Sequence, residues 1–314
     1  MTDTTIEPGR RRGRVLVWLL LAPFALWALL RLTGVLDEVW PWVPLVAFTP
    51  YVAIGAVVAL LLSLLSRRWT PIVVAGVTAV ALTAVALPRA FANAAPPARG
   101  RELRVLAANL MVGQADTAGL MALVRQLKPD ILTLQELTPE ARQRLDDAGL
   151  RELMPYAVDR SREGASGSGI YAASPLTEQP LITNGVFNQA RAATNGLEIV
   201  SVHPCAPKLA RRAACWSAGL RALPRAGGPL RILAGDFNAT LDHGPVRDLL
   251  ASGYQDAGEV TGQGFTATWP QDGHVPGVVI DHVLADRRIA VRSYSVHPLR
   301  GTDHRPVFAE LTLP

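Results

Sequence analysis

Residues 230–239 read Leu-Arg-Ile-Leu-Ala-Gly-Asp-Phe-Asn-Ala. The first five residues, Leu230–Ala234, are mostly apolar and predict a buried strand. The polar group Gly235–Asn238 follows at once, and α/β folds place their functional side chains where strands end. This stretch therefore predicts an α/β domain with an acidic side chain, Asp236, at the edge of a sheet.

Around this stretch, from Glu102 onward, short strand patterns alternate with amphipathic helical patterns. The predicted strands are Leu103–Ala108, Ile131–Leu134, Gly169–Ala173, Leu197–Val202, Leu230–Ala234, Val278–Leu284 and Arg305–Leu313. The predicted helices are Thr117–Leu127, Pro139–Ala148, Leu209–Leu223 and Gly244–Ala251. The succession predicts a sheet-rich α/β sandwich over residues 102–314.

The first third of the chain has a different composition. Of all residues 49% are hydrophobic, which excludes a disordered or fibrous protein, and residues 15–87 are almost free of charge. Three apolar stretches cover residues 15–36, 43–65 and 70–87. A helix needs about 20 residues to cross the hydrocarbon core of a membrane. We therefore predict a membrane anchor of three transmembrane helices within residues 1–90, followed by a linker at 91–101.

Two other interpretations of these stretches exist. The first stretch follows a basic segment, as the apolar core of a cleaved signal peptide does. The stretches could also form a buried helical hairpin of a soluble protein. We prefer a retained anchor, because two further apolar stretches follow and the region around Arg31 lacks a clean small-residue cleavage site.

The arginines predict the orientation of this anchor. Arg10, Arg11, Arg12 and Arg14 precede the first stretch, and Arg67 and Arg68 separate the second from the third. Short segments rich in arginine stay in the cytoplasm. We therefore expect a multi-pass protein of a bacterial-type cell membrane, with a cytoplasmic N-terminus, an extracytoplasmic globular domain, and the lipid bilayer as its partner.

The formal charge of +5 belongs mostly to this anchor. Residues 1–98 carry eight arginines and four acidic residues, whereas the rest of the chain carries 23 basic and 22 acidic residues. Binding to nucleic acid usually needs a strong basic excess, because it neutralises phosphates. The near-neutral domain therefore disfavours nucleic acid as a partner.

The chain has two cysteines, Cys205 and Cys215, both in the part expected to lie outside the cytoplasm. In an oxidising compartment two nearby cysteines pair, so we expect a disulfide that rigidifies the segment after His203. The alternative is a pair of buried free thiols.

Polar residues recur where the predicted strands end, and together they form a set of motifs. The motifs are Ala-Asn-Leu around Asn109, Leu-Gln-Glu ending at Glu136, Val-His at His203, Gly-Asp-Phe-Asn-Ala at 235–239, Ile-Asp-His at 280–282 and Thr-Asp-His-Arg-Pro at 302–306. Taken singly, an acid at a strand end is more often a cap or a turn residue. As a set and in this order, they resemble the endonuclease/exonuclease/phosphatase superfamily of metal-dependent phosphohydrolases.

This resemblance implies two packed β-sheets flanked by helices and a role for each matched residue. Glu136 would be the principal ligand of a Mg²⁺ ion, or of Mn²⁺ in its place, with Asn109 and Asp303 helping. Asp236 would orient or deprotonate the attacking water, and Asn238 would hydrogen-bond water or phosphate. His203 and His304 would both donate to phosphate as cations, and Asp281 would hold His304 in that state.

The chain departs from the common superfamily pattern at two places. His282 stands where many relatives have tyrosine, and Pro-Cys-Ala-Pro-Lys follows His203. Neither departure removes a catalytic group. We also expect His243 and Arg305 to lie near the substrate, although a helix start is the other interpretation of His243.

The anchor, rather than the motifs, predicts the substrate. A tethered site meets lipid-linked substrates at high effective concentration. The domain order and the run from Gly235 to His243 also resemble membrane-anchored members linked to teicoplanin and vancomycin resistance. That resemblance implies hydrolysis of undecaprenyl pyrophosphate or a related cell-wall lipid. The alternatives are a membrane-tethered extracellular nuclease or phosphodiesterase, and a non-enzymatic module that has kept the fold.

Overall fold

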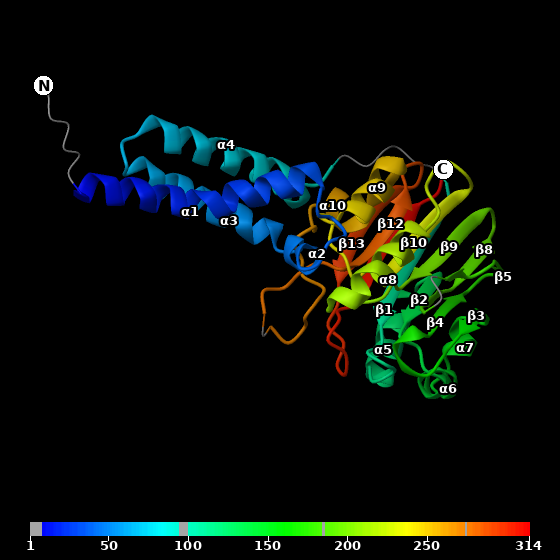
Figure 1. Cartoon of the computed structure of the whole chain (residues 1–314). Helices are drawn as coiled ribbons and strands as arrows, with labels where there is room; N and C mark the ends of the chain where they lie inside the picture. Colours follow the sequence, from blue (N-terminus) through cyan, green and yellow to red (C-terminus); the bar gives the residue numbers. More distant parts are fainter. Residues whose placement is uncertain (1–7, 94–99, 184–185, 274) are drawn as a thin grey trace, which may run out of the picture.

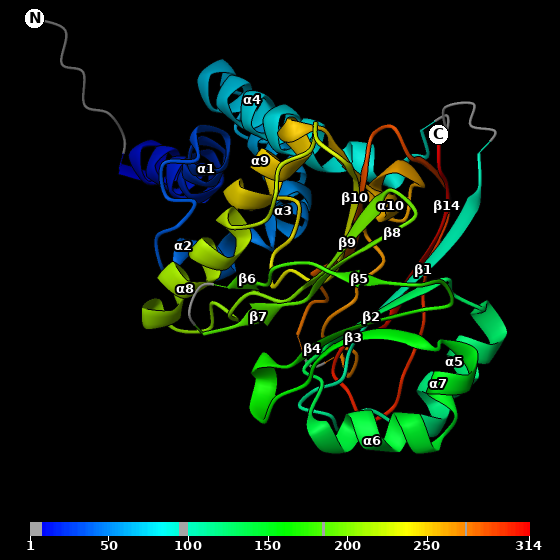
Figure 2. The same ribbon diagram turned by 90° about the vertical axis from the view of Figure 1, so that its right-hand side faces the viewer.

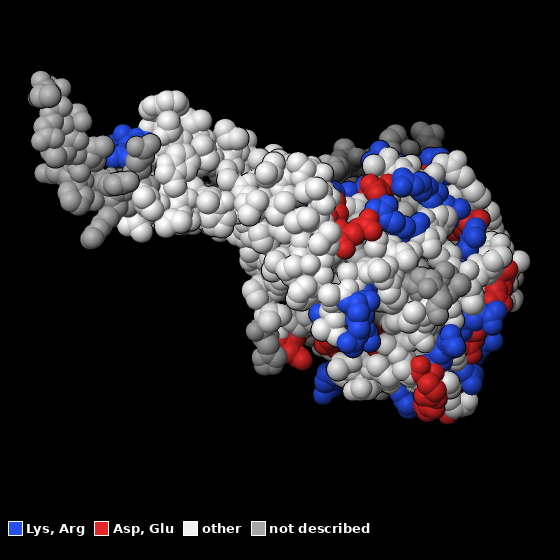
Figure 3. Space-filling view, in the orientation of Figure 1, with Lys and Arg blue, Asp and Glu red and all other residues white. Residues whose placement is uncertain are grey.

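The computed structural model describes residues 8–93, 100–183, 186–273 and 275–314, and consists of a long helical bundle joined to an α/β domain (Figure 1). The bundle contains α1 (Pro8–Thr33), α3 (Thr49–Leu64) and α4 (Trp69–Ala86). Small side chains such as Ala28, Ala56 and Ala79 are buried where the helices meet, and leucines and valines cover the outside. On the face shown in Figure 3, charged side chains gather on the domain and at the far end of the bundle.

The second predicted span differs from the observed helices. Residues 43–65 are divided between a short helix, α2 (Trp42–Val46), and α3. Pro50 lies in the first turn of α3, where the missing N–H costs nothing, but it would interrupt a longer helix. With 16 residues, α3 is about 24 Å long, which is less than the hydrocarbon core.

Two helical segments in the described part of the chain are long and apolar enough to cross a membrane by length and composition alone, Val15–Thr33 and Trp69–Ala90. The second of them combines α4 with η1 (Leu87–Ala90).

Within the described residues, the strands of the α/β domain form two sheets of six strands and one small sheet of two. The first sheet, in the order β13-β14-β1-β2-β4-β3, contains Ala290–Val296, Val307–Thr312, Glu102–Asn109, Ile131–Gln135, Ser168–Ala172 and Tyr156–Arg160. The second, in the order β11-β12-β10-β9-β8-β5, contains Tyr254–Asp256, Asp281–Asp286, Leu230–Asp236, Leu197–Val202, Arg191–Thr194 and Thr177–Glu178. β6 (Ile182–Thr183) pairs with β7 (Asn188–Gln189).

The two large sheets face each other, and helices cover their outer sides (Figure 2). Side chains such as Val105 of the first sheet and Ile232 of the second fill the space between them. The helices of the domain are α5 (Thr117–Leu127), α6 (Pro139–Asp147), α7 (Leu150–Leu153), η2 (Gly164–Ser166), α8 (Ala210–Arg221), α9 (Gly244–Ser252) and α10 (Ala257–Val260). The predicted sandwich of two packed sheets flanked by helices is confirmed.

The register of the central strands brings the polar motifs to one edge of the sandwich. In the first sheet β1 and β2 are parallel, and Asn109 pairs with Gln135 at their carboxyl ends. In the second sheet β10 runs antiparallel to β12, and Asp236 pairs with Asp281. The predicted strand Val278–Leu284 starts later than expected, at Asp281, because Val278 forms a separate bridge with Trp269.

A buried ion-pair cluster joins the bundle to the domain. The carboxylate of Asp242 accepts hydrogen bonds from Arg31 Nε at 2.8 Å and from Arg89 Nη1 and Nη2 at 2.7 and 2.9 Å. All three side chains are buried. Burial opposes ionisation of Asp242, but Arg89 and Arg31 outweigh this effect and hold its pKa below the usual range.

Residues 34–48, which connect α1 to α3 and which we call the connecting segment, make further contacts with the domain. Glu38 accepts hydrogen bonds from Arg221 and Ser217, and Asp37 forms an ion pair with Arg247. Since these contacts come from several elements, the connecting segment is fixed against the second sheet and its helices.

Replacement of Asp242 by alanine leaves Arg31 and Arg89 buried without their counter-ion. Removing one partner of a buried ion pair costs about 3–5 kcal/mol. We expect a large drop in the thermal unfolding temperature of the detergent-solubilised protein. The matched control is Asp248→Ala, because the Asp248 side chain is 49% exposed and exposed pairs contribute less than about 1 kcal/mol. Equal unfolding temperatures for the two variants would contradict this role of Asp242.

Candidate active site

The polar edge of the sandwich forms a cavity of about 550 Å³. From the domain it is lined by Glu136, His203, Asp236, Asn238, Asp303 and His304. Pro44, Ala47 and Phe48 of the connecting segment line the same cavity. The site is therefore a joint product of the domain and the N-terminal part of the chain.

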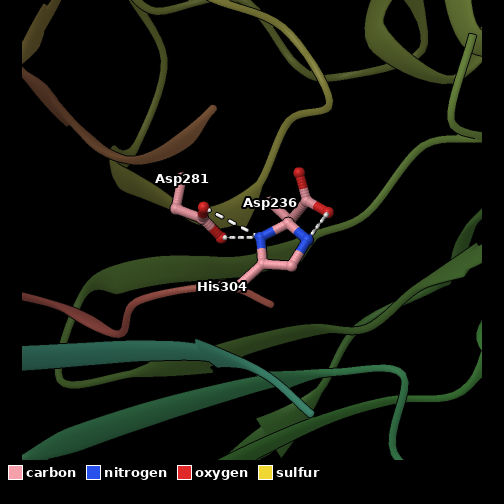
Figure 4. Close-up of side chains that lie close together, drawn as sticks. All are labelled: Asp236, Asp281 and His304. Carbon is pink, nitrogen blue, oxygen red and sulfur yellow. Dashed lines mark hydrogen bonds and ion pairs between the residues drawn. The ribbon is translucent and has the colours of Figure 1, made fainter. Parts of the chain in front are cut away.

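His304 and Asp281 form a buried pair (Figure 4). The imidazole Nδ1 lies 3.1 and 3.0 Å from the two carboxylate oxygens of Asp281, and Nε2 lies 3.7 Å from Asp236 Oδ2. Burial lowers the pKa of His304, but the carboxylates of Asp281 and Asp236 outweigh burial and raise the pKa to about 10. His304 is therefore a cation at neutral pH, with Nε2–H directed toward Asp236.

Asp236 ends β10 and is held from both sides. Its Oδ2 accepts hydrogen bonds from Asn109 Nδ2 at 3.0 Å and Asn238 Nδ2 at 3.2 Å, and its Oδ1 accepts one from the backbone N–H of Asn238 at 2.7 Å. Burial raises the pKa of Asp236. Gly235 before it has φ +143°, and a Cβ there would lie 2.4 Å from the carbonyl oxygen of Val202, so this turn requires glycine.

Glu136 and Asp303 line the same cavity. Glu136 Oε2 accepts a hydrogen bond from the backbone N–H of Val112 at 2.7 Å, and Oε1 accepts a longer one from Asn109 Nδ2 at 3.3 Å. Asp303 Oδ2 accepts a hydrogen bond from Trp269 Nε1 at 2.8 Å. Burial raises the pKa of Glu136.

The environment of His203 differs from that of His304. Its Nε2 lies 3.6 Å from Glu136 Oε1 and 3.7 Å from Asp236 Oδ2, and Phe187 packs edge-on against the ring. Burial lowers the pKa of His203, and the nearby carboxylates do not reverse this shift. Burial therefore favours the neutral form of His203, whereas the raised pKa of His304 favours its cation, and the predicted catalytic roles of both histidines stay predictions.

Comparison with known proteins identifies the family of the α/β domain. The model of the Endonuclease/Exonuclease/phosphatase family matches residues 106–304, which contain all the residues of the α/β domain named above as lining the cavity. The chain belongs to this family. Enzymes of this superfamily hydrolyse phosphoester bonds and depend on divalent metal ions.

Solved structures share the fold of the α/β domain. Truncated Caenorhabditis elegans TDP2 is 16% identical with a TM-score of 0.53, and the match covers 69% of this chain and 100% of that chain. An AP endonuclease from Archaeoglobus fulgidus is 16% identical with a TM-score of 0.53, covering 66% and 98%. A Beutenbergia cavernae endonuclease/exonuclease/phosphatase is 16% identical with a TM-score of 0.51, covering 68% and 72%. None of the curated proteins compared with the chain matches it.

The charge of the site fits the divalent cation of the endonuclease/exonuclease/phosphatase family. Among the described residues, four carboxylates gather here, those of Glu136, Asp236, Asp281 and Asp303. His304 offsets one of these charges. Burial raises the pKa of Glu136 and Asp236, as expected for carboxylates whose charge is incompletely balanced. A cation that prefers oxygen ligands would supply the missing positive charge.

Two groups of side chains could hold that ion. The ligand atoms of Asp236, Asp281 and His304 lie within 4.8 Å of one another. However, a protonated His304 has no free lone pair for a metal, so we interpret this triad as a charged histidine between two carboxylates. Glu136 and Asp303 offer further carboxylate oxygens in the same cavity, and a metal held by these two residues stays a prediction.

Asn109, the third predicted ligand, has a different orientation in this arrangement. Its Oδ1 accepts a hydrogen bond from the backbone N–H of Met111 at 2.9 Å, and its Nδ2 faces Asp236 and Glu136. Asn109 thus holds the two carboxylates in place, and direct ligation by Asn109 stays a prediction.

The predicted disulfide is confirmed. Cys205 and Cys215 are bonded, with their Cα atoms 5.8 Å apart. The bond ties the segment after His203 to α8. Asn238 Nδ2 donates a hydrogen bond to the carbonyl oxygen of Pro204 in the same segment, so the disulfide supports one wall of the cavity.

His243 and Arg305 contact the protein more than the cavity. His243 is fully buried, and burial lowers its pKa to about 4. The neutral ring donates from Nε2 to the carbonyl oxygen of Val43 at 2.8 Å and accepts at Nδ1 from the backbone N–H of Thr240 at 2.9 Å. It forms part of the cavity wall, and its hydrogen bond to Val43 holds the connecting segment against the domain.

Arg305 donates to the carbonyl oxygens of Ala267 and Gln271, at 2.8 and 3.1 Å. It holds the loop that carries Trp269 and does not line the cavity. The structure therefore favours a structural role for Arg305 over a direct contact with substrate. His282 is equally structural, because its ring is bonded to Asp256 and to the carbonyl oxygen of Ala239.

Sequence reasoning missed two groups of cavity residues. Pro44, Ala47 and Phe48 were interpreted only as part of a membrane span, and no local pattern relates them to motifs far along the chain. Lys208 and Arg212, which are exposed and line the cavity, follow the His203 motif closely, and their charge was a usable signal for binding an anion.

The Asp281–His304 pair predicts a pH dependence. His304 stays cationic below its pKa of about 10, so activity that needs the imidazolium falls only as the pH rises through that value. In Asp281→Asn the pKa moves down toward the ordinary value of about 6.5. We expect the alkaline limb of the pH profile, measured with a soluble phosphodiester, to move to lower pH. The control is Asp272→Asn at an exposed position. An unchanged alkaline limb in Asp281→Asn would show that His304 is not the group that titrates.

Proposed function

We propose that this protein is a membrane-anchored hydrolase that uses Mg²⁺, or Mn²⁺ in its place, to cleave a lipid-linked phosphate or pyrophosphate such as undecaprenyl pyrophosphate. One observation carries the proposal. Pro44, Ala47 and Phe48, which adjoin the apolar helices, line the same cavity as the catalytic set. An active site with one wall formed by its membrane anchor suits a substrate whose phosphate lies at the membrane surface.

The residues of the cavity have distinct roles in this reaction. Glu136 and Asp303 would hold the cation, which would neutralise charge on the phosphoryl oxygens. Asp236 orients the attacking water and accepts its proton, while Asn238 and Asn109 fix the carboxylate. His304 donates from Nε2 to a phosphoryl oxygen and stabilises the charge that develops there, and neutral His203 donates a second hydrogen bond. The water oxygen bonds to phosphorus and the bond to the leaving oxygen breaks.

An extracytoplasmic site is consistent with the shape of the molecule. The turn with Arg67 and Arg68 joins α3 to α4 at the end of the bundle far from the domain (Figure 1). Arginine-rich turns favour the cytoplasmic side, so the domain would lie on the opposite side. The disulfide fits an oxidising compartment.

The run from Gly235 to His243 supports the link to glycopeptide-resistance enzymes and hence to cell-wall lipids. Its last two residues, Asp242 and His243, both contact the N-terminal part of the chain. The run therefore has a physical reason to accompany an anchored form of the fold.

A membrane-tethered nuclease is the second candidate. Lys208 and Arg212 at the cavity could contact a nucleic acid backbone, and the structural neighbours include an AP endonuclease. The near-neutral charge of residues 99–314 counts against it.

The experiment compares substrates with the full-length protein in detergent. Undecaprenyl pyrophosphate, a phosphodiester lipid, and single- and double-stranded DNA are each supplied with Mg²⁺, with Mn²⁺ or with EDTA. We expect release of phosphate from the pyrophosphate, loss of that release with EDTA, and a fall in kcat of at least about a hundredfold in Asp236→Asn, which removes the proton acceptor. Asp272→Asn is the control.

DNA cleavage without lipid hydrolysis would overturn the lipid proposal in favour of the nuclease. Full activity of Asp236→Asn, or activity that survives EDTA, would contradict the proposed chemistry itself.

A further inference from the structure

A second cavity of about 420 Å³ lies between the helical bundle and the domain. Its walls are largely apolar and come from α3, α4 and η1 on one side and from loops of the domain on the other. Residues that show this character are Ile54, Val57, Leu87, Leu241, Phe265 and Val279. We call this cavity the apolar groove.

The apolar groove adjoins the active-site cavity. Ala47 and Val278 line both. At this boundary Tyr51 Oη donates a hydrogen bond to the carbonyl oxygen of Gly277 at 2.7 Å, which ties α3 to the loop between the two cavities. The two charged residues of the groove wall, Arg89 and Asp242, are paired with each other. A ligand could therefore place a polar head among the catalytic residues and an apolar chain in the groove.

We propose that the apolar groove binds the part of the hydrocarbon chain next to the phosphate of the lipid substrate. This inference rests on the proposed function, and it adds a specificity site made by the bundle itself. The remaining chain would continue into the bilayer beside α3 and α4.

A hydrocarbon chain suits the groove better than a peptide does. An extended peptide needs partners for its backbone N–H and C=O groups, and the wall is mostly hydrocarbon. Ile54 and Phe265 remain 65% and 44% exposed, so apolar surface is available for burial. The groove also lies against Trp69–Ala90, one of the two segments that are apolar enough for a bilayer, which is where a lipid chain would be. Burying chain carbons there favours long substrates over short ones with the same head group.

The test uses two substrates with one head group. Isopentenyl pyrophosphate has a single isoprene unit and geranylgeranyl pyrophosphate has four. Val57 and Val58 are neighbours on α3, 39% and 49% exposed, but only Val57 lines the groove. Val57→Trp therefore fills the groove, and Val58→Trp is its matched control. Phe265→Asp introduces a charge from the domain side.

We measure kcat/KM of the full-length protein for both pyrophosphates and take the ratio of long to short. The ratio should fall about tenfold or more in Val57→Trp and Phe265→Asp, as the loss of a few buried chain carbons predicts. In Val58→Trp it should keep the wild-type value. The rate with the short substrate reports on the catalytic residues in each variant. A misfolded variant would lose activity toward both substrates and give no ratio. Phe265→Asp lies in an exposed loop, so we expect it to fold and to give a ratio even if Val57→Trp does not.

Three results would overturn the inference. If wild type hydrolyses both pyrophosphates and the ratio is unchanged in Val57→Trp and Phe265→Asp, the groove does not bind the chain, although the proposed function stands. If Val57→Trp and Val58→Trp lower the ratio equally, the effect belongs to the bundle as a whole. If wild type hydrolyses no lipid pyrophosphate, the proposed function fails and the groove inference fails with it.

Discussion

The buried carboxylate of Asp242 is the interaction on which the arrangement of the molecule depends. It is bonded to Arg31 of α1 and Arg89 of η1, so two segments of the N-terminal region converge on one residue of the domain. Burying charges is costly unless they are paired with good geometry, and this cost restricts the bundle to the docked position. His243, next in sequence, adds a bond to Val43. The connecting segment is thereby fixed where it lines the catalytic cavity.

The catalytic cavity also contains buried charged groups, but there the carboxylates outnumber the imidazolium. At Asp242 two arginines face one carboxylate, whereas around Asp236 several carboxylates face one imidazolium, His304. In the first cluster the carboxylate is fully paired by protein side chains, and the pairing holds two parts of the chain together. The second is left short of positive charge, which suits a divalent cation and a phosphate that shares it. The protein therefore contains one charged cluster that holds the bundle on the domain and a second that is suited to hydrolysis of a phosphate ester.

Much of the fold and site could be predicted from the sequence, because the decisive signals were local. The predicted strands end close to Asn109, Glu136 and Asp236, as the observed strands do. The disulfide was predicted from two cysteines close together in the sequence. Other features depend on distant contacts. Arg31 and Asp242 are 211 residues apart, and no pattern near either one indicates the pair. The neutral state of His203 and the structural role of Arg305 depend on burial and partners. Pro50 was a signal that residues 43–65 are divided between α2 and α3. The prediction followed the continuous hydrophobicity of the stretch instead, and so gave one helix.

In the function proposed for this protein, the anchor and the domain form one active site for a lipid in the same membrane. The most direct measurement reconstitutes the full-length protein in nanodiscs and compares hydrolysis of undecaprenyl pyrophosphate placed in the same disc with that in separate, protein-free discs. We expect rapid release of phosphate only from substrate in the same disc, and loss of this preference in Asp242→Ala, whose bundle is no longer held in place. Equal rates from both kinds of disc would show that the anchor does not form part of the site.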